Sequence, residues 1–387
     1  MTTQATAPVP GYETRSPADP LRAGQRLVSL DALRGFDMFW ILGGETLIQA
    51  LPDNAPVVGF LKDQFEHRNW EGVAFYDLIF PLFVFIVGVS LVFSLSKTIA
   101  LDGKAAAIRR VIFRSVAIYV IGILYYHGLR TDRNGQEHQY IRLMGVLQRI
   151  AIAYFGASLI FLFFGLRGRI IATATLLVGY WALLTFVPVP GVGHSFAEGK
   201  NLTNWFDSQY LPLFKWEFKD WDPEGLLSNF PAIATCMLGV FAGLLMKNGR
   251  VEPMRKVTWL LAAGAAGVLL GELCGLQFPV IKKLWTSSYV LVAGGYGAIM
   301  LALFYLVIDI WRIRGWSTPF VWIGMNAITL YVIENILDFR ALSLRFVGEH
   351  ARQWLGLWAP FTVAAVAVLL MLLLARFLYK RQIFLRL

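Results

Sequence analysis

Long apolar runs alternate with short polar connections along most of the chain. A helix that crosses a bilayer needs about 20 mostly apolar residues, because about 30 Å of hydrocarbon is covered at about 1.5 Å per residue. About ten runs reach this length, and we expect each to form a membrane-spanning helix. In chain order, the expected helices are residues 28–51, 76–95, 111–126, 144–164, 170–187, 230–246, 257–274, 287–310, 320–337 and 359–379.

The composition supports the same all-α, polytopic helical bundle. Hydrophobic residues make up 57% of the chain and charged residues 16%, whereas soluble domains carry about 25% charged residues. The first 25 residues are polar and lack the apolar core of a cleavable signal peptide. We therefore expect a cytoplasmic tail over residues 1–25 and a single transmembrane domain over residues 26–387, with a long outer loop at residues 188–229.

The net charge of +10 follows the expected membrane topology. Lys and Arg gather on alternate connections, and the positive-inside rule places these connections and both termini in the cytoplasm. The basic residues of these segments are Arg15, Arg22, Arg26, Lys97, Lys104, Arg109, Arg110, Arg167, Arg169, Lys247, Arg250, Arg255, Lys256, Arg312, Arg314, Arg376, Lys380, Arg381 and Arg386. We therefore expect the lipid bilayer, and no nucleic acid, as a partner. A basic inner face would also attract an anionic cytoplasmic ligand.

Residues 340–354 differ from the expected spanning helices. Three arginines are interspersed there with leucine, phenylalanine and tryptophan. This mixture is typical of an amphipathic helix that lies on the membrane surface rather than crossing it. We expect the segment to anchor the protein at the interface.

Charged residues inside the first expected helix are the most unusual feature of the sequence. A charge in lipid is costly, so it usually faces a cavity or a partner. Arg34 lies three residues after Asp31 and three before Asp37, which places the three side chains close to one helix face. One interpretation is a charge cluster that fixes helix packing, and the other is a binding site. Glu45 follows two glycines, which would let another backbone or a ligand approach closely.

His67 precedes the second expected helix and lies near several carboxylates in the sequence. A histidine in a loop is normally a solvated surface residue. Here Glu66, Glu71 and Asp77 could orient the imidazole and raise its basicity, as a general base requires. Arg149 and Glu334 are further candidates within the expected helices. Arg149 could snorkel, pair with a carboxylate or hold a substrate.

Several common catalytic and metal-binding patterns are missing from the sequence. It contains no HExxH, Walker loop or GxSxG motif, and its histidines lack metal-ligand spacing. Zinc protease, P-loop ATPase and serine hydrolase activities are therefore unsupported. We expect no metal.

The segment around His67 resembles the signature of the heparan-α-glucosaminide N-acetyltransferase family of transmembrane acyltransferases. It reads HRNWEGVAFYDLIFP over residues 67–81. Further segments match the family in the same order: SLDALRG at 29–35, GVLQR at 145–149, VPVPG at 187–191, DPEG at 222–225, LW at 284–285 with SYV at 288–290, GMN at 324–326 and YKRQIF at 379–384. The resemblance thus extends from about residue 26 to the C-terminus.

This resemblance implies an enzyme that takes an acetyl group from acetyl-CoA on the cytoplasmic side and passes it to the amine of a glucosamine on the other side. His67 matches the family's catalytic histidine, which acts either as a general base or as a transient acetyl carrier. Glu45 falls where the mammalian enzyme has an asparagine implicated in the active site, so the mechanism is not carried over at that position. We expect Glu45, His67 and Asp77 to line the point where donor and acceptor meet. Candidates for binding the donor or acceptor are Arg34, Asp37, Trp70, Arg149, Ser288, Tyr289 and Asn326.

The large lumenal region of the mammalian enzyme has no counterpart in this sequence, which suggests a bacterial inner-membrane protein whose outer side faces the periplasm. The resemblance also implies a homodimer. Two alternatives remain open: an O-acyltransferase of a cell-envelope glycan, and a secondary transporter of sugars, because polar residues inside a bundle also mark translocation paths. A transporter would be expected to show internal symmetry, which is not evident in the sequence.

Overall fold

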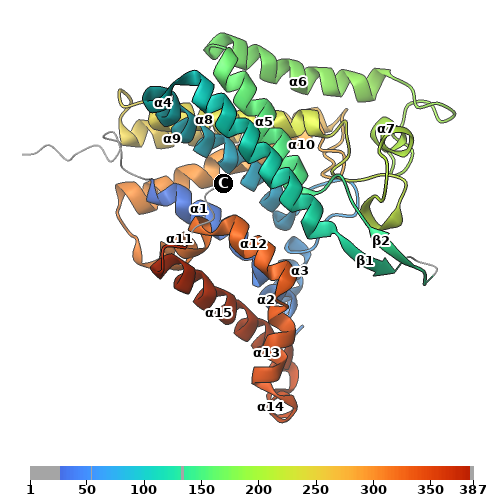
Figure 1. Cartoon of the computed structure of the whole chain (residues 1–387), viewed down its shortest axis with the longest axis vertical. Helices are drawn as coiled ribbons and strands as arrows, with labels where there is room; N and C mark the ends of the chain where they lie inside the picture. The colour runs from blue at the N-terminus through green and yellow to red at the C-terminus, as the bar shows by residue number, and fades with distance from the viewer. Residues whose placement is uncertain (1–26, 54, 132–134, 384–387) are drawn as a thin grey trace, which may run out of the picture.

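The computed structural model describes residues 27–53, 55–131 and 135–383, and the expected cytoplasmic tail of residues 1–25 lies outside these ranges. Within them the chain forms a helical bundle (Figure 1). The helices are α1 (Val28–Phe39), α2 (Glu45–Gln49), α3 (Pro56–Gln64), α4 (Ile79–Tyr126), α5 (Val146–Phe163), α6 (Leu166–Phe186), α7 (Leu202–Tyr210), α8 (Asn229–Lys247), α9 (Pro253–Gly275), α10 (Ser287–Phe304), α11 (Thr318–Met325), α12 (Ala327–Ile336), α13 (Phe339–Val347), α14 (Glu349–Leu355) and α15 (Ala359–Lys380).

Seven helices among the described residues are long and apolar enough to cross a membrane. They span Phe75–Tyr126, Val146–Phe163, Leu166–Phe186, Asn229–Lys247, Pro253–Gly275, Ser287–Ile310 and Arg352–Lys380. The first of these contains two of the expected spans, residues 76–95 and 111–126. The helix between them breaks at Gly103, whose φ of +82° is a backbone conformation that glycine adopts without a steric penalty.

Two other expected spans are interrupted helices. Residues 28–51 form α1, a π-helical segment at Trp40–Gly44 and α2, with non-helical backbone at Leu42 and Gly43. Residues 320–337 lie in α11 and α12, which meet at Asn326. Neither region contains a single helix of spanning length, so the count of about ten spans stays a prediction.

Four helices, α4, α5, α8 and α10, supply much of the buried core. Val84 and Leu91 of α4, Ala157 of α5, Val240 of α8 and Ala293 of α10 are among its members. In contrast, only Thr173, Tyr180 and Leu184 of α6 are buried, and Figure 1 shows this helix at the edge of the bundle. An apolar helix with an exposed surface is what lipid contact requires.

Close packing of α1 against α11 positions Arg34. A Cβ atom added at Gly324 would lie 2.0 Å from the backbone oxygen of Asp31, so the two helices touch through their backbones. Small residues permit such contacts between membrane helices. The contact leaves the Gly324 carbonyl 3.4 Å from a guanidinium nitrogen of Arg34.

Two connections differ from the sequence-based expectation. Residues between α4 and α5 contain an antiparallel pair of strands, β1 (Gly128–Thr131) and β2 (Glu137–Tyr140), which the all-α prediction missed. Periodicity favoured helices because these strands are only four residues long and mostly exposed. The expected single interfacial helix at residues 340–354 was also wrong, because Gly348 has a φ of +68° and separates α13 from α14.

Candidate active site

Asp77 holds His67 from within the loop that joins α3 to α4. The Oδ1 atom of Asp77 lies 2.8 Å from Nδ1 of His67. The Oδ2 atom of the same carboxylate accepts hydrogen bonds from the backbone N–H groups of Arg68 and Ala74, at 3.2 and 3.1 Å. The fully buried Asp77 is thereby fixed by its own loop. Because the carboxylate engages Nδ1, Nε2 is the ring nitrogen of His67 left for chemistry, with the Lys282 Nζ atom 3.5 Å from it.

Lys282 joins this pair and was not expected from the sequence. Its Nζ atom lies 3.1 Å from Oδ1 of Asp77 and 3.0 Å from Nδ1 of His67. Burial lowers the pKa of Lys282, while the negative charge of Asp77 acts in the opposite direction. The contact depends on backbone pairing, because the Gly72 N–H donates to the Val280 carbonyl at 2.9 Å. The only feature of the sequence that pointed to this segment was the family motif LW at residues 284–285, close to Lys282.

Tyr76 and Glu45 complete the surroundings of the imidazole. The Tyr76 ring stacks on His67, with the ring centroids 4.7 Å apart. The half-buried Glu45 carboxyl interacts electrostatically with His67. His67 and Asp77 are thus in direct contact, whereas Glu45 does not line the cavity into which His67 opens, and its part in the meeting point stays a prediction. Tyr289, also named from the sequence, donates a hydrogen bond of 2.6 Å to the backbone oxygen of Asp77.

His67 opens into a cavity of about 740 Å³. The walls come from the His67 loop, the β1–β2 hairpin, the outer loop and the segment before α10. Its lining includes Arg130, Tyr140, Trp216, Glu217 and Lys283. The side chain of His67 is 53% exposed, so a ligand in this cavity can reach the imidazole.

A buried ion pair supports the wall of this cavity. Arg142 donates to both carboxylate oxygens of Asp222, at 2.7 and 2.6 Å, and to Glu224 at 2.5 Å. The two carboxylates raise the pKa of Arg142 above its ordinary value, against the effect of burial. Nearby, burial raises the pKa of Asp207 to about 7. This network ties the outer loop to the connection before α5, and its arginine was not singled out from the sequence.

Several expected binding residues lie outside the lining of the His67 cavity. Arg149 is 1% exposed and donates to the Pro223 carbonyl at 2.9 Å, while its guanidinium lies over the Trp285 ring at 4.6 Å. Ser288 is fully buried and donates to the Pro279 carbonyl at 3.1 Å.

Trp70 and Asp37 also lie outside the lining of the His67 cavity. Trp70 donates its ring N–H to the Phe196 carbonyl at 2.8 Å. Asp37 is fully buried in α1, and neither of its carboxylate oxygens has a hydrogen-bond partner among the described residues. Whether any of these residues contacts a substrate stays a prediction.

A second cavity, of about 530 Å³, lies further along α4 and α5 from His67, and we call it the basic cavity. Its lining includes Arg34, Ser90, Arg110, Arg114, Tyr154 and Asn326. Arg34 forms an ion pair with Asp31 at 3.4 Å and donates to the Ser90 hydroxyl at 2.7 Å. Arg114 lies over the Tyr154 ring at 4.9 Å, and its Nε has no hydrogen-bond partner among the described residues. Three guanidinium groups around one cavity favour a phosphate-bearing ligand.

A narrow apolar space of about 20 Å³ lies between the two cavities. It shares Phe83 and Ile150 with the basic cavity and Val146 with the His67 cavity. Along the chain the order runs from Asp77, just before α4, through Phe83 of α4 to Ser90, which lines the basic cavity. The three spaces therefore follow one another through the bundle.

Comparison with known proteins gives consistent matches. The family model described as "Heparan-alpha-glucosaminide N-acetyltransferase, catalytic" matches residues 26–270, which include His67 and Asp77 but not Lys282. The human protein named heparan-alpha-glucosaminide N-acetyltransferase is 29% identical over 83% of this chain and 55% of its own length. The mouse protein of the same name is 26% identical over 83% of this chain and 56% of its own length. The chain thus spans about half the length of these relatives.

Proposed function

Because the chain belongs to the heparan-alpha-glucosaminide N-acetyltransferase family, we propose that it is a membrane acetyltransferase that moves an acetyl group from acetyl-CoA to the amine of a glucosamine-type sugar. The observation that carries this proposal is the His67 imidazole, held by Asp77 and exposed to a cavity large enough for a sugar. The relatives' names support an amino sugar as acceptor. An imidazole oriented by a carboxylate suits acyl transfer to an amine.

The basic cavity fits the donor's chemistry. Acetyl-CoA carries phosphates at one end and a narrow pantetheine arm at the other, and the arginines of this cavity would hold the phosphates. The pantetheine arm would pass through the narrow apolar space between the two cavities, which we call the apolar neck, so that the thioester reaches His67. We place the basic cavity on the cytoplasmic side of a bacterial inner membrane and His67 on the periplasmic side, since the basic connections favour that orientation.

The reaction can be written for the residues around His67. The acceptor nitrogen attacks the thioester carbonyl carbon, a C–N bond forms, the C–S bond breaks, and coenzyme A leaves as a thiolate that takes up a proton. His67 Nε2 accepts the proton that the amine loses, while Asp77 stabilises the resulting imidazolium. In the alternative route His67 first carries the acetyl group and the amine then attacks the acetyl-imidazole. Glu45 is suited to binding the acceptor's ammonium group before that proton is lost.

The decisive experiment incubates purified protein with isotopically labelled acetyl-CoA and glucosamine. We expect release of coenzyme A and formation of labelled N-acetylglucosamine, both lost in His67→Ala. His194→Ala is the matched control, because His194 is an exposed loop histidine outside the cavity lining. Full turnover by His67→Ala would overturn the catalytic assignment. An ester product would indicate an O-acyltransferase, and movement of sugar without coenzyme A release would indicate a transporter.

The same assay distinguishes the general-base route from the route in which His67 carries the acetyl group. A pulse of labelled acetyl-CoA without acceptor leaves label on the protein in the acetyl-carrier route, and loss of that label in His67→Ala assigns it to His67. A homodimer is also proposed from the family resemblance, and its mass in a detergent micelle tests this assembly.

A further inference from the structure

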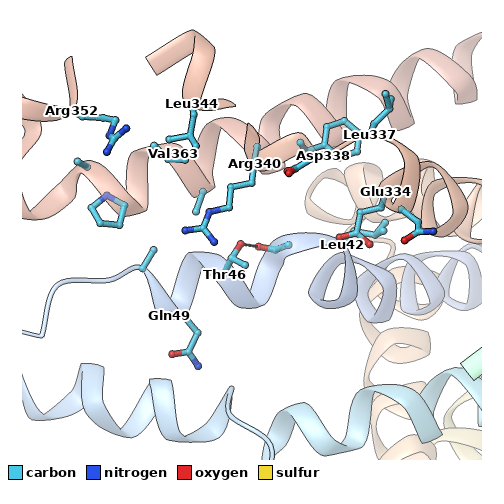
Figure 2. Close-up of a pocket in the computed structure, with 18 of the residues that line it drawn as sticks. Leu42, Thr46, Gln49, Glu334, Leu337, Asp338, Arg340, Leu344, Arg352 and Val363 are labelled. Carbon is cyan, nitrogen blue, oxygen red and sulfur yellow. Dashed lines mark hydrogen bonds between the residues drawn. The ribbon is translucent and has the colours of Figure 1, made fainter. Parts of the chain in front are cut away.

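A cavity of about 660 Å³ lies beside α15, and we call it the α15 cavity. It is lined by α2, the last residues of α12, the short helices α13 and α14, and the first two turns of α15 (Figure 2). It shares no lining residue with the His67 cavity or with the basic cavity. The function proposed above assigns no ligand to it.

The kink after α1 shapes the inner end of this cavity. Gly43 has a φ of +111°, and a Cβ atom added there would lie 3.5 Å from a methyl group of Val368 on α15. The kinked segment therefore packs close to α15 at this level. Gly43 and Ala367, which precedes Val368, are the lining residues nearest to this contact.

One end of the α15 cavity is cationic. Figure 2 shows Arg340 extending from α13 towards Thr46 of α2, with Arg352 on the same side. Arg340 has no ion pair among the described residues. Arg352 pairs with Glu349 at 3.8 Å, but both side chains are more than 40% exposed, so this pair is weak.

The lining also contains two acidic residues. Figure 2 shows Glu334 away from the arginines, near Leu42, whereas Asp338 lies close to the start of the Arg340 side chain. Asp338 is occupied as the cap of α13, where it accepts a hydrogen bond from the Ala341 N–H at 2.8 Å. The two guanidinium groups are therefore available to an anion, and phosphate is a preferred partner of arginine.

The face that α15 presents to the cavity is apolar and elongated. Val363, Ala364 and Ala367 lie on one face of α15. From Ala359 to Ala367 the helix rises about 12 Å at about 1.5 Å per residue. A ligand that fits must combine a phosphate with a hydrocarbon chain.

The large apolar side chains exposed around the α15 cavity favour a position at the level of the lipid headgroups. Trp354 is 92% exposed, Leu357 79% and Phe346 68%, and all three lie on or beside α13 and α14. Exposed aromatic residues of this kind concentrate at membrane interfaces. We propose that the α15 cavity binds an anionic phospholipid, with its phosphate at Arg340 and Arg352 and an acyl chain along α15.

Dioctanoyl phosphatidylglycerol, titrated into the purified full-length protein in detergent, tests this proposal. Two further probes separate the parts of the ligand: glycerol phosphate has the anion without chains, and dioctanoylglycerol has the chains without the anion. We expect each partial probe to bind at least about 10-fold more weakly, because a charge-assisted pair and apolar burial each contribute that much. Equal binding of glycerol phosphate would show a site for a soluble anion and overturn the proposal.

Variants locate the binding in the α15 cavity. The double variant Arg340→Gln with Arg352→Gln should weaken phosphatidylglycerol binding by about 10-fold or more. Arg345→Gln is the matched control, because Arg345 lies exposed on α13 outside the cavity lining. Ala367→Phe should weaken lipid binding by filling the apolar end. Unchanged binding in the double variant would overturn the proposal. If a variant fails to fold, judged by thermal melting, the three probes on the wild-type protein still decide.

Discussion

The ammonium group of Lys282 lies 3.1 Å from Oδ1 of Asp77, the same oxygen that lies 2.8 Å from Nδ1 of His67. One buried carboxylate oxygen thus contacts both a lysine and the imidazole. Lys282 compensates the charge that Asp77 carries inside the protein. Because an unpaired buried charge is costly, this contact allows Asp77 to stay ionised beside His67.

Replacing Lys282 by Met is therefore expected to lower kcat by about 10-fold or more, because Asp77 would lose its compensating charge. Lys282→Arg should retain more activity than Lys282→Met. The comparison variant is Lys200→Met, since Lys200 is exposed in the outer loop and does not line the His67 cavity. Initial rates at saturating acetyl-CoA and glucosamine measure the effect. Equal kcat values for Lys282→Met and wild type would contradict the role given to Lys282.

Asp77→Asn is expected to reduce kcat by about 100-fold or more while leaving the protein folded. An amide can present its NH₂ group to Nδ1 of His67, which favours the tautomer with the proton on Nε2 and blocks that nitrogen as a base. Asp63→Asn is the control, because Asp63 is exposed in the preceding helix and pairs with Arg68 at 2.7 Å. Steady-state kinetics and thermal melting are measured together. If Asp77→Asn lowered the melting temperature so far that the loss of folded protein accounted for the fall in kcat, Asp77 would have a structural role only.

The basic cavity predicts a donor-specific effect. Arg110→Gln combined with Arg114→Gln should raise KM for acetyl-CoA by about 10-fold or more, because two charges that face the donor's phosphates are removed. KM for glucosamine should change little. Arg109→Gln is the neighbouring control, since Arg109 is exposed and does not line the cavity. Equal increases in KM for both substrates would argue against a separate donor site.

Asp207 predicts a pH dependence of stability. Burial raises the pKa of this carboxyl to about 7, from an ordinary value of 3.8, so the folded outer loop favours the protonated form. The resulting stabilisation is complete below about pH 4 and is lost as the pH rises through about 7. Asp207→Asn should remove this dependence and melt at a higher temperature than wild type at pH 8. Thermal melting at pH 5, 6, 7 and 8 tests it, and identical pH profiles would contradict the assignment.

The His67 and Asp77 pair was predictable because the two residues lie in one short loop and share one motif. Lys282 was not, since it comes from a segment 215 residues away that reaches His67 through the Gly72 and Val280 backbone contact. Hydropathy located the apolar segments, because composition alone decides which stretches suit lipid. The kink at Leu42 and Gly43 depends on local backbone geometry and packing against α15, which apolar periodicity does not encode.

The apolar neck between the two large cavities also affects the membrane itself. A space of about 20 Å³ holds about one water molecule, and its aliphatic and aromatic walls give a hydrated ion little to replace its water shell. In the orientation proposed above, the bundle would hold water-filled cavities on both sides of the bilayer without offering ions a path down the electrochemical gradient.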